Sequence, residues 1–154
     1  MRGEYFEDIS VGDTHEFGSY SVEKEEMLSF ATQYDPQSFH IDPAAAEESL
    51  FGGLVASGLH TAAISQRLVV ENVFHDSRAM GAIGGDKLRW NHPVRPGDTL
   101  SMTAEVVEKK PNDATHGLIK FEMTTFNQND IEVMSLILSV IYQIRSDTDE
   151  KESK

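Results

Sequence analysis

The spacing of apolar residues differs between the two halves of the chain. Early on, apolar positions recur every three or four residues, as in an amphipathic helix with one buried face. Four residues carry this pattern: Met27, Phe30, Ala31 and Tyr34. Ser21 is the expected N-cap, followed by acidic residues that favour a helix N-terminus. Pro36 disfavours helical dihedrals in the preceding residue, so this helix should end at Asp35.

A short helix and a long one are expected next. Asp42 followed by Pro43 is typical of an N-cap and a first helical position, so "AAAEESL" predicts a short helix that stops at Gly52-Gly53. The segment 57–74, "SGLHTAAISQRLVVENVF", is apolar on most sides over its middle turns. That pattern is typical of a helix buried in a core.

The second half of the chain alternates between apolar and polar positions, as half-buried strands do. Three segments show this alternation: "TLSMTAEVVE" (99–108), "GLIKFEMTTF" (117–126) and the run 133–144. The last has apolar residues on both faces, as a central strand would. Two further strands are expected in "THEFGSY" (14–20) and "GGDKLRW" (84–90). This order predicts an α+β fold with an antiparallel sheet wrapped around a long central helix.

Length and composition indicate one globular domain. The chain has 154 residues, of which 39% are apolar and 25% charged, and no internal repeat is visible. Residues 4–145 are expected to form the domain. The polar segment 146–154, "SDTDEKESK", is expected to be a disordered tail.

The charge of the chain excludes several classes of partner. A formal net charge of −13 repels nucleic acid and anionic membrane surfaces. No stretch approaches the ~18 apolar residues of a membrane-spanning helix, and the first residues lack the apolar region of a signal peptide. The chain has no cysteine, which removes disulfides, thiol nucleophiles and cysteine-based zinc sites. Together these features favour a cytoplasmic protein.

Cofactor and metal motifs are missing from the sequence. The glycine-rich "GAIGGD" matches neither the P-loop nor the dinucleotide fingerprint. The chain has no His-x-x-x-His pair on a predicted helix, and most of its six histidines are scattered. We therefore expect no cofactor and no metal ion.

The stretch "YDPQSFHID" (34–42) places Asp35 and His40 on a short connection between two helices. A carboxylate and an imidazole a few Å apart can hold one water and move protons to and from it. Their ordinary pKa values, about 3.9 and 6.5, give complementary protonation states near neutrality. The alternative is that Asp35 caps the next turn and His40 is a partly exposed loop residue. Spacing alone favours that alternative.

Gly58 in "ASGLHT" (56–61) opens the long helix. Backbone N–H groups at a helix N-terminus can stabilise an oxygen that gains negative charge, such as a thioester carbonyl becoming an enolate. The alternative is that Ser57 is the N-cap and Gly58 permits close packing, and the two roles are compatible. Ser57 and His60 have no clear third partner, so serine-hydrolase chemistry is not favoured.

The segment 34–64, from "YDPQSFHID" to "SGLHTAAI", resembles the hydratase motif of the MaoC-like dehydratases, the (R)-specific enoyl-CoA hydratases of the hot-dog fold. Five residues stand at the positions of that motif: Asp35, His40, Asp42, Phe51 and Gly58. "NHPVRPGDTLSMTAEV" (91–106) is similar to the second signature of the family, and 5–22 to its opening strand. The resemblance covers about residues 4–144.

The resemblance implies a hot-dog fold, usually assembled as a homodimer, and a role for each motif residue. Asp35 and His40 would be the catalytic pair, and the N–H of Gly58 the oxyanion donor. Ser57 and Phe51 would join Gly58 in binding the substrate. Coenzyme A would be present only as part of an acyl-CoA substrate. Its phosphates would lie near basic residues chosen by charge alone: Lys87, Arg89 and Arg95.

The implied reaction is reversible, (R)-specific addition of water to a 2-enoyl-CoA, giving a 3-hydroxyacyl-CoA as in fatty acid metabolism. Two alternatives remain open. Hot-dog proteins also include acyl-CoA thioesterases, which release a free thiol. A non-catalytic acyl-CoA-binding subunit is the other alternative, although the intact pair of Asp35 and His40 argues against it.

Overall fold

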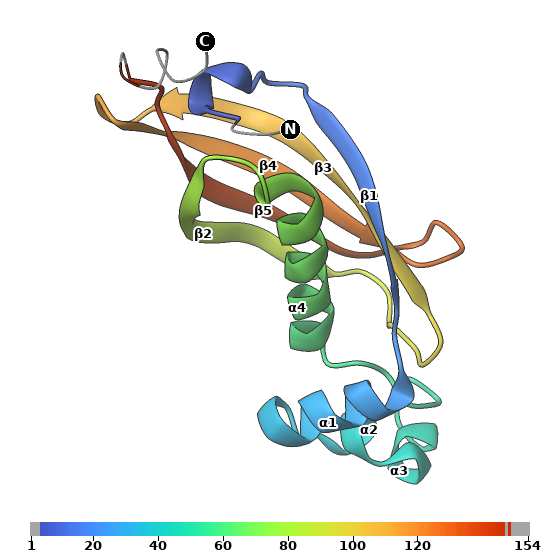
Figure 1. Ribbon diagram of the computed structural model, residues 1–154. Helices are drawn as coiled ribbons and strands as arrows, with labels where there is room; N and C mark the ends of the chain where they lie inside the picture. The colour runs from blue at the N-terminus through green and yellow to red at the C-terminus, as the bar shows by residue number, and fades with distance from the viewer. Residues whose placement is uncertain (1–3, 147, 149–154) are drawn as a thin grey trace.

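Five strands form one antiparallel sheet in a computed structural model that describes residues 4–146 and 148. The strand order is β1-β3-β4-β5-β2, so β1 and β2 are the edge strands (Figure 1). The bounds are β1 (Thr14–Ser21), β2 (Ala79–Trp90), β3 (Thr99–Pro111), β4 (His116–Phe126) and β5 (Glu132–Gln143). Consecutive hairpins of β3, β4 and β5 build the centre, as the alternating pattern predicts.

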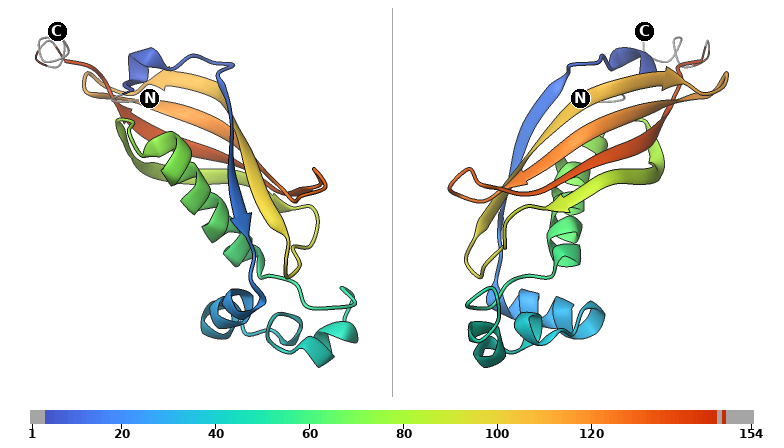
Figure 2. Two further views of the ribbon diagram at one scale, coloured as in Figure 1. Left: turned by 45° about the vertical axis from the view of Figure 1, so that its right-hand side comes forward. Right: turned by 180° about the vertical axis from the view of Figure 1, so that it is seen from behind.

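The long helix α4 (Gly58–Val69) lies against one face of this sheet, as Figure 2 shows from two sides. A π-helical turn (Val70–Phe74) continues it, so the helical segment reaches the predicted end. Ile64, Leu68 and Val69 of α4 share one buried cluster with side chains of the central strands. The predicted α+β arrangement, a sheet around a central helix, is confirmed.

One side of α4 is more exposed than its sequence predicts. Leu59 on α4 is 52% exposed, and Val70, the first residue of the π-helical turn, is 42% exposed. The edge strand β2 also exposes large apolar side chains: Met80, Ile83 and Trp90. The free edge of β2 and these side chains thus form an apolar surface that the chain's own core leaves uncovered.

Three short helices lie at the N-terminal end of α4 (Figure 1). They are α1 (Lys24–Tyr34), α2 (Ser38–Ile41) and α3 (Pro43–Glu47). α1 ends before Asp35, as Pro36 predicts. The predicted Asp42 cap is also present, because its Oδ1 accepts hydrogen bonds from the N–H groups of Ala44 and Ala45.

Two of the predicted helix ends are wrong. Ser21 is not a cap but the last residue of β1, where it pairs with Thr99 of β3; Glu23 precedes α1 without a side-chain cap. The short helix ends at Glu47 and not at Gly52-Gly53. It ends early because Ser49 turns the chain, with its hydroxyl donating to the carbonyl of Ala46 and accepting from the N–H of Phe51.

Two further elements differ from the sequence prediction. The connection after Pro36 is not all loop, because Ser38–Ile41 form the helical turn α2, with the N–H groups of His40 and Ile41 bonded to the carbonyl of Gln37. β2 begins at Ala79, five residues before the predicted strand 84–90, because its glycine-rich part also pairs with β5. The tail 146–154 lies outside the described residues except at 146 and 148, so the bounds 4–145 stay a prediction.

Candidate active site

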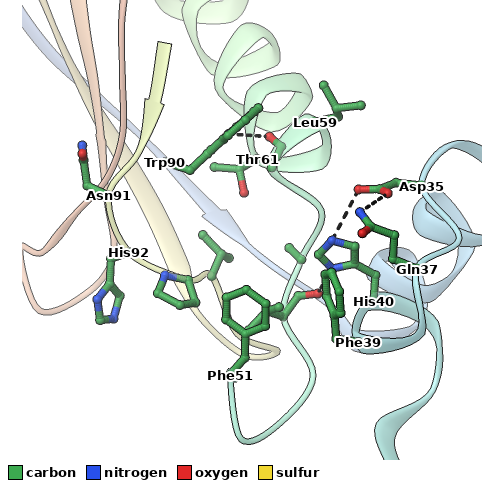
Figure 3. Close-up of a pocket in the computed structure, with 15 residues that line it drawn as sticks. Asp35, Gln37, Phe39, His40, Phe51, Leu59, Thr61, Trp90, Asn91 and His92 are labelled. Carbon is green, nitrogen blue, oxygen red and sulfur yellow. Dashed lines mark hydrogen bonds and ion pairs between the residues drawn. The ribbon is translucent and has the colours of Figure 1, made fainter. Parts of the chain in front are cut away.

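Asp35 and His40 face each other where α1 ends and α2 begins (Figure 3). Asp35 is the C-cap of α1, and its N–H donates to the carbonyl of Ala31 at 2.8 Å. His40 is 6% exposed, so it is not the partly exposed loop residue that spacing alone favoured. Its Nε2 lies 3.3 Å from Oδ2 of Asp35.

The protonation of the His40 ring follows from its second contact. Nδ1 lies 2.8 Å from the carbonyl oxygen of Val55. A carbonyl oxygen only accepts, so Nδ1 carries a hydrogen and Nε2 is the nitrogen that faces Asp35. In neutral His40, Nε2 and the carboxylate are both acceptors. The mismatch between these two acceptors is removed by a proton bound to Nε2 or by a water that donates hydrogen bonds to both atoms. The contact is therefore suited to holding a water and moving its proton.

Two hydrogen-bond donors, from Ser57 and Gln37, hold the carboxylate of Asp35. The hydroxyl of Ser57 donates to Oδ2 at 2.7 Å, and the amide of Gln37 donates to Oδ1 at 2.7 Å. Burial raises the pKa of Asp35, but hydrogen bonds from Ser57 and Gln37 and the charge of His40 outweigh it and bring the pKa below its usual value. The carboxylate is therefore ionised at neutral pH and acts as an acceptor.

The first turn of α4 offers one backbone donor to the site. Ser57 is the N-cap: its hydroxyl accepts from the N–H of Leu59, and its carbonyl accepts from those of His60 and Thr61. Within the described chain, the N–H of Gly58 has no acceptor. First-turn N–H groups lack intrahelical partners, so this one is available to a ligand oxygen, as the sequence predicts.

Trp90, the last residue of β2, covers Gly58. Its Nε1–H donates to the carbonyl of Gly58 at 2.9 Å. A Cβ at position 58 would lie 2.4 Å from Cε2 of the indole, which is far inside van der Waals contact. Only glycine fits beneath this ring. The close packing proposed for Gly58 therefore accompanies its free N–H.

These groups line one pocket of about 360 Å³. Asp35, His40 and Gly58 supply its polar side. Apolar side chains supply the rest of the wall: Phe39, Phe51, Leu59, Trp90, Pro93 and Val94. Phe51 is held against Phe39, with ring centroids 5.3 Å apart. The structure thus brings the predicted residues Asp35, His40, Phe51 and Gly58 to one pocket, with Ser57 behind Asp35.

Sequence reasoning missed the parts of the site that depend on distant pairing. The substrate-binding role of Ser57 stays a prediction, and the bond from its hydroxyl to Asp35, 22 positions away in sequence, was not foreseen. Gln37 and Trp90 were not singled out at all. The one signal that points to Trp90 is its place as the only tryptophan, directly before the "NHPVRPGD" signature.

The three basic residues chosen by charge separate in the structure. Lys87 and Arg89 line a different hollow, together with Glu122 and residues of β5. Arg95 reaches the pocket rim, where its guanidinium donates to the carbonyl of Phe51 at 2.6 Å. Of these three, Arg95 is the cation placed nearest the pocket residues.

His60 belongs to a second group of titratable residues, between α1 and α4. Its Nε2 lies 3.2 Å from Oε1 of Glu26, which also accepts from the Tyr20 hydroxyl. The ring stacks on Phe30 at 4.6 Å. His60 therefore contacts Glu26, while the Ser57 hydroxyl contacts Asp35. His60 is therefore not positioned to activate Ser57 as a nucleophile.

Among residues 4–146 and 148, no three His, Asp or Glu side chains are grouped as they would be around a metal ion. Over the same residues, every helix is too short or too polar to cross a membrane.

The sequence profile of the MaoC like domain matches residues 8–126, which is most of the chain. The chain belongs to the MaoC-like domain family. An uncharacterized protein YdeM from Bacillus subtilis (strain 168) is 30% identical over 135 residues, covering 88% of this chain and 96% of that relative.

Two solved structures have the same fold as this chain. A MaoC-like dehydratase from Rhodospirillum rubrum is 37% identical with a TM-score of 0.86, covering 94% of this chain and 99% of that one. The R-hydratase PhaJ1 from Pseudomonas aeruginosa is 22% identical with a TM-score of 0.71, covering 94% and 92%. The hot-dog fold predicted from the motif is thereby confirmed.

Proposed function

We propose that this MaoC-like protein adds water reversibly to the double bond of a 2-enoyl-CoA thioester, giving the (R)-3-hydroxyacyl thioester. The observation that carries the proposal is the 3.3 Å contact between Oδ2 of Asp35 and Nε2 of His40, in one pocket with the free N–H of Gly58. Acid/base groups and an oxyanion donor are the two requirements of this reaction.

The steps follow from the protonation states in the pocket. Asp35 and His40 hold a water; one O–H bond of it breaks as its oxygen bonds to C3 of the enoyl group, and the proton passes to the Asp35/His40 pair. The π electrons move to the thioester oxygen, forming an enolate, and the pair then returns one proton to C2 as the carbonyl re-forms. The N–H of Gly58 stabilises the enolate oxygen. Loss of one such donor raises a barrier by ~2.7–4 kcal/mol. No cofactor takes part in this scheme.

We also infer that the working form is a homodimer in the cytoplasm, where coenzyme A thioesters are made and used. Two features support self-association. The edge strand β2 has one unpaired side, and it exposes Met80 and Ile83. Exposed apolar side chains on an edge strand are an unfavourable surface for a monomer.

Crotonyl-CoA hydration, followed by loss of the enoyl absorbance, tests the proposal. The wild-type protein should hydrate it and give the (R) product on chiral analysis. Asp35→Asn and His40→Ala should each lower kcat by orders of magnitude while the circular dichroism spectrum and melting temperature show a folded chain. Full activity in both variants overturns the assignment.

The same samples separate the alternatives. Release of free thiol from saturated acyl-CoA, without hydration, indicates a thioesterase. Saturable binding of acyl-CoA without any turnover indicates a binding subunit.

A further inference from the structure

We propose that Trp90 determines which acyl groups this pocket admits, and that its indole restricts them to slim, unbranched chains next to the thioester. This inference rests on the proposed function for the substrate class. Its geometric basis is independent of the chemistry, because it concerns the wall of the pocket and not the acid/base pair.

Trp90 is fixed at three places, two on its indole and one on its backbone. Its Nε1–H donates to the carbonyl of Gly58 at 2.9 Å. Its ring lies on the Cα of Gly58 so closely that no Cβ fits there. Its backbone belongs to the ladder with Met134 of β5. A side chain held in this way does not swing aside for a ligand, although Trp90 is 48% exposed.

The segment after Trp90 is also anchored. The N–H of Asn91 donates to the carbonyl of Val133 at 2.9 Å, and the carbonyl of Val94 accepts from the N–H of Ala56 at 2.8 Å. The wall formed by Trp90 and residues 91–94 is therefore tied to the sheet on one side and to the start of α4 on the other.

The opposite side of the pocket is aromatic and anchored too. In Figure 3, Phe51 lies across the pocket from Trp90, with Asp35 and His40 to one side. The Phe51 ring packs on Phe39, and the backbone carbonyl of Phe51 accepts a hydrogen bond from the Arg95 guanidinium at 2.6 Å. Two rigid aromatic walls limit the width of the acyl group more than its length.

The position of the indole beside Gly58 indicates where this limit applies. An oxygen bound to the N–H of Gly58 brings the thioester and the neighbouring carbons next to the Trp90 ring. A planar, unbranched 2-enoyl group fits along an aromatic wall. A ring or a branch at those carbons meets the indole. The pocket volume of about 360 Å³, near the lower end for ligand sites, agrees with a small acyl group.

The test compares Trp90→Ala and Trp90→Phe with the wild-type protein. Calorimetric titration gives the dissociation constants of butanoyl-CoA and cyclohexanecarbonyl-CoA, which do not react by hydration. Wild type should prefer the linear thioester, and Trp90→Ala should reduce that preference roughly tenfold or more. Trp90→Phe keeps an aromatic wall and should retain most of the preference. Val11→Ala, at an exposed apolar position that does not line the pocket, is the control and should leave the preference unchanged.

Hydration kinetics provide the second readout. With crotonyl-CoA and cinnamoyl-CoA, the ratio of kcat/KM should shift toward cinnamoyl-CoA in Trp90→Ala. A change in stability alone lowers both values without moving their ratio. An unchanged ratio of dissociation constants in a folded Trp90→Ala overturns the inference. Binding without hydration by the wild type overturns the proposed function instead, and the binding ratio still decides the role of Trp90. Failure of the wild type to bind either thioester overturns both.

Discussion

Ser57 donates a 2.7 Å hydrogen bond to Oδ2 of Asp35, joining the N-terminus of α4 to the C-terminus of α1. The same oxygen faces Nε2 of His40. Ser57 is 1% exposed, so the bond is shielded from competing water. It aligns the carboxylate, and it also fixes the distance between the acid/base pair and the free N–H of Gly58.

Ser57→Ala should lower the hydration rate about tenfold or more, because hydrogen bonds to a charged group contribute about 1.5–3 kcal/mol. The loss should appear in kcat of crotonyl-CoA hydration, since the hydroxyl is bonded to the carboxylate of Asp35. Ser29→Ala, a matched change at an exposed position of α1, should be silent. Equal rates for wild type and Ser57→Ala would show that the hydroxyl does not position Asp35.

The lowered pKa of Asp35 predicts how the site responds to acid. Burial opposes ionisation of Asp35, but the donors Ser57 and Gln37 and the nearby His40 favour it and prevail. The folded pKa is thus below the unfolded one. The stability that Asp35 contributes is present above the unfolded value, 3.8, and is lost as the pH falls through the lower folded value.

Carbon-detected NMR of the Asp35 carboxyl group measures this pKa directly. The midpoint should lie below 3.8 in the wild type and should rise in Gln37→Leu, which removes the bond to Oδ1. A midpoint at or above the ordinary aspartate value in the wild type would mean that burial dominates, contrary to the geometry.

The Glu26–His60 pair predicts a stability effect at the joint between α1 and α4. His60 is 2% exposed, and Glu26 is the acceptor within reach of its Nε2. Glu26→Leu should cost about 1–3 kcal/mol of unfolding free energy, because it leaves a buried donor without a partner. Tyr20→Phe removes an exposed hydrogen bond to the same carboxylate and should cost less. Urea unfolding measures both, and equal costs would contradict the assignment.

Local signals in the sequence predicted helix ends well when the structural cause lay within a few residues. Pro36 ends α1, and Asp42 caps α3, because both effects act on neighbouring backbone groups. Ser21 has the same local signal as a cap, but pairing with Thr99 keeps it in β1. A partner so distant in the sequence cannot be read from the residues around Ser21.

The candidate site likewise divides into residues that a local motif identifies and long-range contacts that it does not. Asp35, His40 and Gly58 are recognisable from a motif, and the structure brings them to one pocket. The contacts that hold them there join positions 22 and 32 residues apart, in the Ser57–Asp35 and Trp90–Gly58 bonds. Those contacts depend on how α4 meets α1 and β2 in three dimensions, which no local pattern specifies.

The packing of Trp90 on Gly58 predicts an energetic coupling between the two positions. Gly58→Ala should destabilise the fold by about 1–3 kcal/mol, because the new Cβ would lie 2.4 Å from the indole and force the ring to move. In a Trp90→Ala background the same Cβ meets no ring, and the cost should largely disappear. Urea unfolding of the four proteins completes the double-mutant cycle, with a coupling of at least about 1 kcal/mol expected. Additive costs would mean that the ring is not held against Gly58 in solution, and Trp90 would then have no fixed wall to present to a substrate.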